Sequence, residues 1–161
     1  LQDGKGFTKD SLRDAAFDSA QPEFEVLRPG LVKAYDQLPA GHAMKARLKD
    51  QIALLRTWDS RWSADSAANT LAIFWGEELW RRSAPEAAKA GVSVYEFMRS
   101  KATPSQRLEA LAAASDQLAA DFGRWDTPWG EVNRFQRLTG DIVQPFDDNE
   151  PSIPVPFTSA R

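Results

Sequence analysis

Residues 125–138 have the sequence Trp-Asp-Thr-Pro-Trp-Gly-Glu-Val-Asn-Arg-Phe-Gln-Arg-Leu, and a long helical pattern ends just before them. Pro128 lacks a backbone N–H and Gly130 costs backbone entropy in a helix, so both oppose a regular helix here. From Val132 onward the residues favour a strand, although each side of that strand mixes apolar with polar side chains. The arginine methylenes would cover apolar surface while their heads reach carboxylates or carbonyls. We therefore expect a turn followed by a short strand.

Upstream of this segment, apolar residues recur at helical spacing. Thr8 is a candidate N-cap for a first short helix, and Pro22 suits the start of a second. Pro29-Gly30 should interrupt that second helix and bend the chain before a fresh helix begins. The next pattern predicts one helix from Ala43 to about Thr57.

Capping signals mark three further helices. Ser63 is the expected N-cap of the clearest long helix, which would end near Arg81-Arg82, where basic side chains suit the negative end of the helix dipole. Ser93 opens a capping-box pattern, and Thr103-Pro104 opens another with proline at the first helical position. Gly123 is a suitable residue to end the last helix.

The remaining segment, residues 140–161, contains four prolines and few regularly spaced apolar residues, so neither a helix nor a central strand suits it. We divide the chain into a helical region, residues 1–123, and a turn, short strand and extended arm, residues 124–161. The fold class predicted is a mainly α domain with one or two short strands and an extended proline-rich C-terminal arm.

Composition excludes several classes of partner. The chain has 161 residues, with 20 basic and 23 acidic side chains and a formal net charge of −3. Roughly 150 residues can bury about 70% of their unfolded surface, so one core is expected. A net negative charge does not favour binding to nucleic acid or to anionic lipid. No apolar run approaches the roughly 20 residues that span a bilayer. We expect no nucleic-acid and no membrane partner. The absence of cysteine excludes a thiol nucleophile and zinc–thiolate sites.

The single histidine, His42, does not indicate a serine triad, because the chain has no Gly-x-Ser-x-Gly elbow. We interpret it as an exposed loop residue near a helix start. The run Asp147-Asp148-Asn149-Glu150 could offer oxygen ligands to calcium, but it lacks the spaced Asp-x-Asp-x-Asp-Gly loop. A solvated acidic turn is the preferred interpretation.

Paired acids and ion pairs give no catalytic candidate either. Glu77 and Glu78 are adjacent, so they diverge by about 100° around a helix and do not converge on one substrate atom. We interpret them as a solvated face. Asp59 and Arg61, with Arg56 nearby, suggest an ion-pair network of structural value only.

Tryptophans could form a ligand cage, but at helical positions with apolar neighbours they usually belong to a core. Trp80 and Trp129 are the two whose exposure would be informative. The six are Trp58, Trp62, Trp75, Trp80, Trp125 and Trp129.

Several segments resemble the β chain of penicillin-amidase-family acylases. The resemblance is carried by residues 127–138, and upstream by residues 54–59 (Leu-Leu-Arg-Thr-Trp-Asp) and 70–77 (Thr-Leu-Ala-Ile-Phe-Trp-Gly-Glu). Residues 151–155 and 157–161 are similar to the next part of that β chain. The resemblance covers most of the chain and implies an internal segment of a larger α+β N-terminal-nucleophile hydrolase. Such enzymes cleave amides of β-lactams or of acyl-homoserine lactones.

The resemblance also implies how the reaction would run. In the family, a serine at the start of the β chain attacks the amide carbonyl, its own α-amino group acts as base, and backbone and asparagine donors stabilise the oxyanion. This chain begins with Leu1, and Asn69, Asn133 and Asn149 do not lie in the motif that carries the catalytic asparagine. We therefore assign no catalytic, cofactor-binding or metal-binding residue and expect the chain alone to be inactive.

The expected role is scaffold and pocket wall of an acylase. Its partners would be the α chain, the rest of the β chain and a small-molecule amide substrate, with no cofactor and a periplasmic or extracellular location. As an internal piece, the chain should expose an apolar patch that fits missing acylase strands. The alternatives are a non-enzymatic helical interaction module, whose apolar stripes should be covered, and a small independent hydrolase, which would need a nucleophile.

Overall fold

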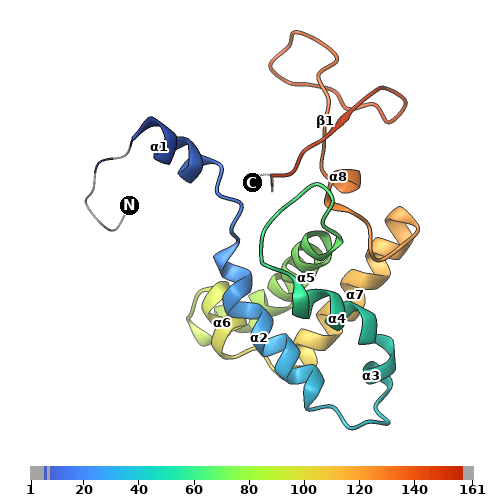
Figure 1. Cartoon of the computed structure of the whole chain (residues 1–161). Helices are drawn as coiled ribbons and strands as arrows, with labels where there is room; N and C mark the ends of the chain where they lie inside the picture. The colour runs from blue at the N-terminus through green and yellow to red at the C-terminus, as the bar shows by residue number, and fades with distance from the viewer. Residues whose placement is uncertain (1–5, 7, 158–161) are drawn as a thin grey trace.

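The computed structural model describes residue 6 and residues 8–157, and Figure 1 shows a helical body from which the first helix and the C-terminal arm project. Leu1 and residues 158–161, which carried sequence-based predictions, lie outside the described residues. The helices are α1 (Lys9–Ala16), α2 (Pro22–Asp36), α3 (Ala43–Arg47), α4 (Lys49–Thr57), α5 (Ala67–Ala90), α6 (Val94–Ser100), α7 (Pro104–Phe122) and α8 (Trp129–Val132). The strands are β1 (Arg134–Phe135) and β2 (Ile153–Pro154). The prediction of a mainly α fold with short strands is confirmed.

The core lies where α5 packs against α7 and α6, with α2 and α4 covering it. Trp75 is 1% exposed at its centre, and its indole N–H donates to the carbonyl of Arg107 at 3.1 Å, so the buried polar atom is satisfied. The apolar side chains buried most completely are Leu31, Leu48, Ile52, Leu55, Leu71, Trp75, Leu79, Leu111 and Leu118. In the part of the chain that the structure describes, no helix is both long and apolar enough to cross a membrane.

Local capping signals predicted most helix starts correctly. Thr8 forms a reciprocal capping box with Ser11, and Thr103 forms one with Gln106. The Ser93 hydroxyl accepts the backbone N–H of Glu96 at 3.1 Å, although the return half of that capping box is not made. These caps satisfy backbone N–H groups that have no partner inside a helix.

The predicted interruption at Pro29-Gly30 is wrong, because α2 runs without a break from Pro22 to Asp36. Proline removes one hydrogen bond inside the helix. Pro29 lies on the exposed side, while Phe24, Leu27 and Leu31 on the opposite side are buried in the core. Packing of that face outweighs the lost hydrogen bond.

Two other helix boundaries differ from the prediction. The cap of α5 is Ser66, whose hydroxyl accepts from Asn69 N–H at 3.1 Å, and Ser63 instead begins the turn before it. The helix passes Arg82 and ends at Gly91, which has φ of 67°. The predicted single helix over residues 43–57 is divided at Leu48, whose side chain is fully buried.

The segment at 128–138 is partly helical, so the expectation that Pro128 and Gly130 exclude a helix is wrong. Pro128 is the N-cap of α8, a position where its missing N–H costs no helical hydrogen bond. The short strand begins at Arg134 rather than Val132 and pairs antiparallel with β2, with Arg134 opposite Pro154 and Phe135 opposite Ile153. As predicted, an arginine head reaches carbonyls, since Arg134 donates to Gly130 O at 3.0 Å and to Ser152 O at 2.7 Å.

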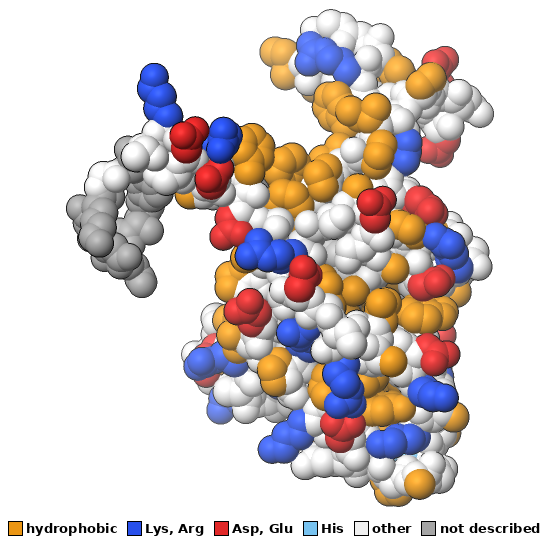
Figure 2. All heavy atoms as spheres, viewed as in Figure 1, with side chains coloured by type: hydrophobic (Ala, Val, Ile, Leu, Met, Phe, Trp, Pro, Cys, Tyr) orange, Lys and Arg blue, Asp and Glu red, His pale blue; other side chains and the backbone are white. Residues whose placement is uncertain are grey.

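The arm is tied to the body through aromatic contacts. The Phe157 ring lies 4.6 Å from the Trp62 ring and 6.0 Å from the Phe17 ring, measured between centroids. Figure 2 shows hydrophobic atoms gathered where the arm joins the body, and again on the arm itself. The arm therefore leaves apolar surface open to solvent.

Candidate functional site

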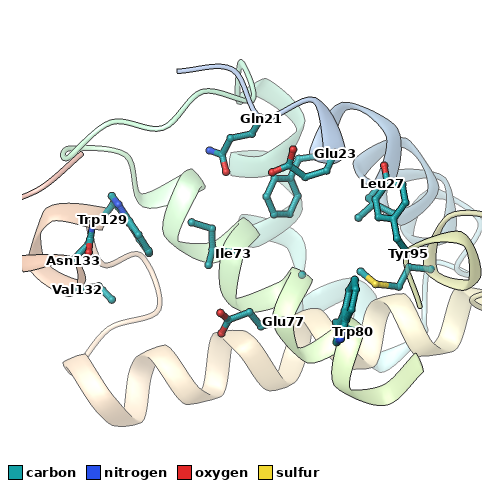
Figure 3. A pocket seen from close by; sticks show the side chains of 13 residues that line it. Gln21, Glu23, Leu27, Ile73, Glu77, Trp80, Tyr95, Trp129, Val132 and Asn133 are labelled. Atoms are coloured by element: carbon teal, nitrogen blue, oxygen red, sulfur yellow. The ribbon is translucent and has the colours of Figure 1, made fainter. Parts of the chain in front are cut away.

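A cleft of about 720 Å³ opens between the start of α2, the middle of α5, α6 and α8 (Figure 3). Its volume falls in the range of roughly 300–1,000 Å³ that small-molecule sites occupy. A second hollow, between α2 and Arg56 of α4, is smaller, at about 400 Å³. The larger cleft is therefore the candidate site.

The first wall belongs to α2 and its N-cap. The residues that line the cleft on this side are Gln21, Glu23, Phe24 and Leu27. Glu23 and Leu27 are four residues apart, so they lie on the same face of the helix. A Cβ on Gly76 of α5 would lie 3.2 Å from the Phe24 ring, so the two helices approach closely at that point. The lack of a side chain at Gly76 leaves room for the Phe24 ring at this point.

The second wall is one face of α5, extended by α6. Ile73, Gly76, Glu77 and Trp80 occupy positions i, i+3, i+4 and i+7, which is one stripe of a helix. Tyr95 and Met98 of α6 complete this side. The wall is mostly apolar, with one carboxylate within it.

The third wall is α8 and the residue after it. The Trp129 side chain is 6% exposed, and its indole N–H donates to Phe157 O at 3.2 Å. Asn133 Nδ2 donates to Val155 O at 2.9 Å and also to Phe157 O. The arm therefore fixes the orientation of this wall.

Two carboxylates give the cleft its charge. Glu23 and Glu77 lie on different walls (Figure 3), and no lysine or arginine lines the cleft. The neighbouring Glu78 points elsewhere: it pairs with Arg81 and Arg82, each at 2.6 Å, and its side chain is only 13% exposed. The hydrogen bond from Arg81, followed by that from Arg82, lowers the pKa of Glu78 against the effect of burial. The cleft thus suits an apolar group and hydrogen-bond donors.

A family model described as penicillin amidase matches residues 1–156. This chain belongs to the penicillin amidase family. A search of curated proteins found no match to the chain. The resemblance noted on the sequence segments is therefore confirmed at the level of the family.

His42 of this penicillin amidase family chain is the exposed N-cap of α3, as the sequence suggested. Its Nδ1 accepts the backbone N–H of Met44 at 3.2 Å. That nitrogen is used by the helix cap, and His42 does not line the cleft. The described residues offer no serine–histidine pair for nucleophilic attack at the cleft.

The acidic run at residues 147–150 forms a turn. Asp147 Oδ1 accepts the backbone N–H and the side-chain N–H of Asn149, both at 2.9 Å, and the backbone bond is the larger cause of the lowered pKa of Asp147. Within residues 6 and 8–157, no three His, Asp or Glu side chains are grouped as a metal site would need. The preferred interpretation, a solvated acidic turn, agrees with this geometry.

Of the two tryptophans singled out in the penicillin amidase family chain, Trp80 is 49% exposed and Trp129 is buried. Both line the cleft, on different walls. Trp58 and Trp75 are buried in the core as expected, whereas Trp62, also expected there, is only partly buried and lies outside it. The exposed indole of Trp80 therefore lines the cleft and is not part of the core.

The predicted ion-pair network of Asp59, Arg61 and Arg56 is wrong. Arg61 pairs with Asp18 at 3.1 Å, and Arg56 pairs with Asp36 at 2.7 Å. Asp59 instead accepts the backbone N–H of Arg61 at 3.0 Å. Residues close in sequence point apart here because the chain leaves α4 in an extended conformation at Trp58.

The asparagines that could not be matched to the family's catalytic motif have structural partners. Asn69 is fully buried and accepts from the Gln21 side chain, Asn133 holds the arm, and Asn149 forms the acidic turn. Asn69 and Asn149 do not line the cleft.

Sequence reasoning missed the cleft, including Gln21, Glu23 and Ile73. The stripe formed by Ile73, Glu77 and Trp80 was a usable signal, since a helix that buries Trp75 and Leu79 must present these residues on another face. The cleft residues on α2 and α8 carried no such signal, because they lie about 50 positions before and after the α5 stripe in the sequence.

Proposed function

We propose that this chain is the helical part of an acylase that hydrolyses the amide bond of an N-acyl compound of the β-lactam or acyl-homoserine-lactone type. It supplies scaffold and a wall of the substrate pocket, and it does not supply the attacking group. The observation that carries the proposal is the family match over residues 1–156, and the apolar cleft supports the role of a wall.

The exposed apolar arm supports packing against the remaining acylase segments. Ile142 is 102% exposed and Val143 is 83% exposed, and Phe146 and Ile153 are more than half exposed. Apolar surface gathered in one place is typical of an interaction site. A stand-alone helical module should have its apolar residues covered, so this observation favours the acylase segment over that alternative.

A periplasmic or extracellular location is part of the same proposal. It rests on the family alone.

The test compares the purified 161-residue chain with the complete product of its gene. Both are incubated with N-phenylacetyl, N-octanoyl and N-glutaryl amides, and released acid is measured by mass spectrometry. We expect the complete product to release at least one acid and the chain alone to release none. Acid release by the chain alone, or by neither sample, would contradict the proposal.

The role of the cleft is tested in the complete product. Ile73→Trp narrows the cleft and should lower kcat/KM for the cleaved amide by about tenfold, roughly 1.4 kcal/mol of transition-state stabilisation. Val26→Trp, at an exposed position of α2 outside the cleft, should leave kcat/KM unchanged. Equal effects of the two variants would show that the cleft does not wall the substrate pocket.

A further inference from the structure

The hairpin formed by β1 and β2 has two outer edges, and the edge of β2 is blocked by proline. Val155 N–H donates to Asn133 O at 2.9 Å, so these two residues direct their backbone groups between the strands. Backbone groups along an antiparallel pair alternate between inward and outward, so Arg134 and Pro154, which lie opposite each other, direct theirs outward. The next outward position after Pro154 is Pro156, and proline has no N–H. The outer edge of β2 therefore cannot donate a hydrogen bond to a further strand at either position.

The outer edge of β1 is open. Outside the pairing of β1 with β2, the backbone N–H of Arg134 donates to no residue that the structure describes. Proteins usually protect an edge strand with proline or with charged side chains that project over it. The Arg134 guanidinium instead turns back across the hairpin, where it donates to Ser152 O at 2.7 Å and to Gly130 O at 3.0 Å. This edge is therefore able to pair with another strand.

An apolar face lies beside the open edge. Phe135 and Ile153 are directly opposite each other, so their side chains share one face of the hairpin, and they are 50% and 61% exposed. The other face is turned toward the body, where a Cβ at Gly130 would lie 2.7 Å from Pro154 Cβ. Figure 1 shows the hairpin projecting from the helical body, and Figure 2 shows hydrophobic atoms on it. A strand added to β1 would extend this apolar face and cover part of Phe135.

The length of the open edge restricts what can bind there. If the edge includes one residue on each side of β1, residues 133–136, it is about 13 Å long at about 3.3 Å per residue. Stable complexes between separate chains bury about 1,200–2,000 Å² in total, over roughly 20–30 residues of each partner. An edge of this length is too short to hold a separate protein or a second copy by itself. A strand of the same gene product needs no such area, because its effective concentration is already of the order of millimolar.

We propose that β1 receives an extended strand from the remaining acylase segments, which adds to the hairpin through main-chain hydrogen bonds. The added strand pairs with the N–H and C=O of Arg134. It carries apolar side chains at alternate positions, on the face formed by Phe135 and Ile153. The source of the strand rests on the proposed acylase function, whereas the open edge rests on the geometry of the hairpin.

Hydrogen exchange, read residue by residue, compares the isolated 161-residue chain with the complete gene product. We expect the backbone N–H of Arg134 to exchange at least about tenfold more slowly in the complete product, because a paired N–H is protected. The N–H of Val155 is the internal control, since it is bonded to Asn133 O within the hairpin itself. It should be protected in both samples.

Two variants separate the backbone of Arg134 from its side chain. Arg134→Pro removes the N–H and the guanidinium, whereas Arg134→Ala removes the guanidinium alone. Asn133, with φ of −96° and ψ of 98°, already has a conformation that a following proline permits. In the isolated chain the two variants should therefore unfold at the same temperature. In the complete product Arg134→Pro should unfold roughly 2 °C lower than Arg134→Ala, the order of shift expected for one lost hydrogen bond.

The proposal is overturned if the Arg134 N–H exchanges equally fast in both samples, or if the two variants unfold together in the complete product. Protection of Arg134 that rises with the concentration of the isolated chain would place a second copy at this edge, which overturns the choice of partner. None of these measurements depends on amide hydrolysis. A complete product that releases no acid would contradict the proposed function and leave the result at β1 to be read separately.

Discussion

Gly30 of α2 faces the guanidinium of Arg107 on α7, and a Cβ at Gly30 would lie 3.2 Å from Arg107 Cζ. The Arg107 side chain cannot retreat easily, because it is 7% exposed and donates to Met98 O at 2.6 Å and to Ala102 O at 3.3 Å. These carbonyls lie at the end of α6, so a buried arginine caps that helix from a neighbouring one. Desolvation lowers the pKa of the Arg107 guanidinium, and its carbonyl partners make this burial tolerable.

Gly30→Ala should destabilise the protein. Overpacking costs about 1–3 kcal/mol, which exceeds the roughly 1 kcal/mol that alanine gains in helix propensity. Urea denaturation measures the free energy of unfolding, with Gly41→Ala as the control because nothing lies within 4 Å of its Cβ position. A Gly30→Ala variant more stable than the natural chain would show that Arg107 moves freely.

Gly130→Ala should loosen the junction of the arm. The added Cβ would lie 2.7 Å from Pro154 Cβ and 3.1 Å from Ala64 O, at a point where Gly130 N–H also donates to Ala64 O at 2.7 Å. We expect a loss of about 1–3 kcal/mol together with faster proteolysis in residues 133–157. Gly140→Ala, which has open space around it, should leave both quantities unchanged. Unchanged proteolysis of Gly130→Ala would contradict the packing described.

Gln136→Leu should release the loop over residues 137–151. The Gln136 amide is 7% exposed, donates to Asp147 O and Glu150 O at 2.9 Å each, and accepts the Asp147 N–H at 2.8 Å. Leucine keeps similar volume but leaves these groups unpaired, at a cost of about 1–3 kcal/mol. Hydrogen exchange of the Asp147 amide should accelerate, whereas Gln37→Leu on the exposed end of α2 should not affect it. An unchanged exchange rate would show that the loop is held by other contacts.

The ion pairs of Glu78 should stabilise the folded chain at pH values above 4.5, the ordinary pKa of a glutamate side chain. In acid this stabilisation should be lost. Its pKa in the folded chain is lowered, chiefly by the hydrogen bond from Arg81, so the folded state favours the carboxylate. The stabilisation is therefore present above pH 4.5 and is lost as the pH falls below that value through the lowered folded-state pKa. Glu78→Gln should cost up to about 1 kcal/mol at pH 7, and this cost should shrink as the pH is lowered below 4.5. Glu86→Gln should show no such trend, and a cost of Glu78→Gln that does not change with pH would contradict the ion-pair explanation.

Part of the candidate site was within reach of the sequence. Ile73, Glu77 and Trp80 share one stripe of α5, and their helix was predicted from Trp75, Leu79 and the residues around them. The two carboxylates were not recognised as a pair of cleft residues, because Glu23 and Glu77 belong to helices whose packing the sequence does not specify. The family resemblance could be stated from short segments, yet those segments carry no information on which side chains meet.

The sequence by itself determined where most helices begin, through interactions that span three or four residues. Thr103 and Gln106 satisfy each other's backbone N–H groups whatever lies beyond them, and Gly123 adopts a φ of 79° that few other residues tolerate. Tertiary structure alone decided that Pro29 remains inside a helix, that Pro128 and Gly130 begin a short one, and that three walls enclose a cleft. Burial of an entire helix face can outweigh one lost hydrogen bond, and that burial depends on partners far away in the chain.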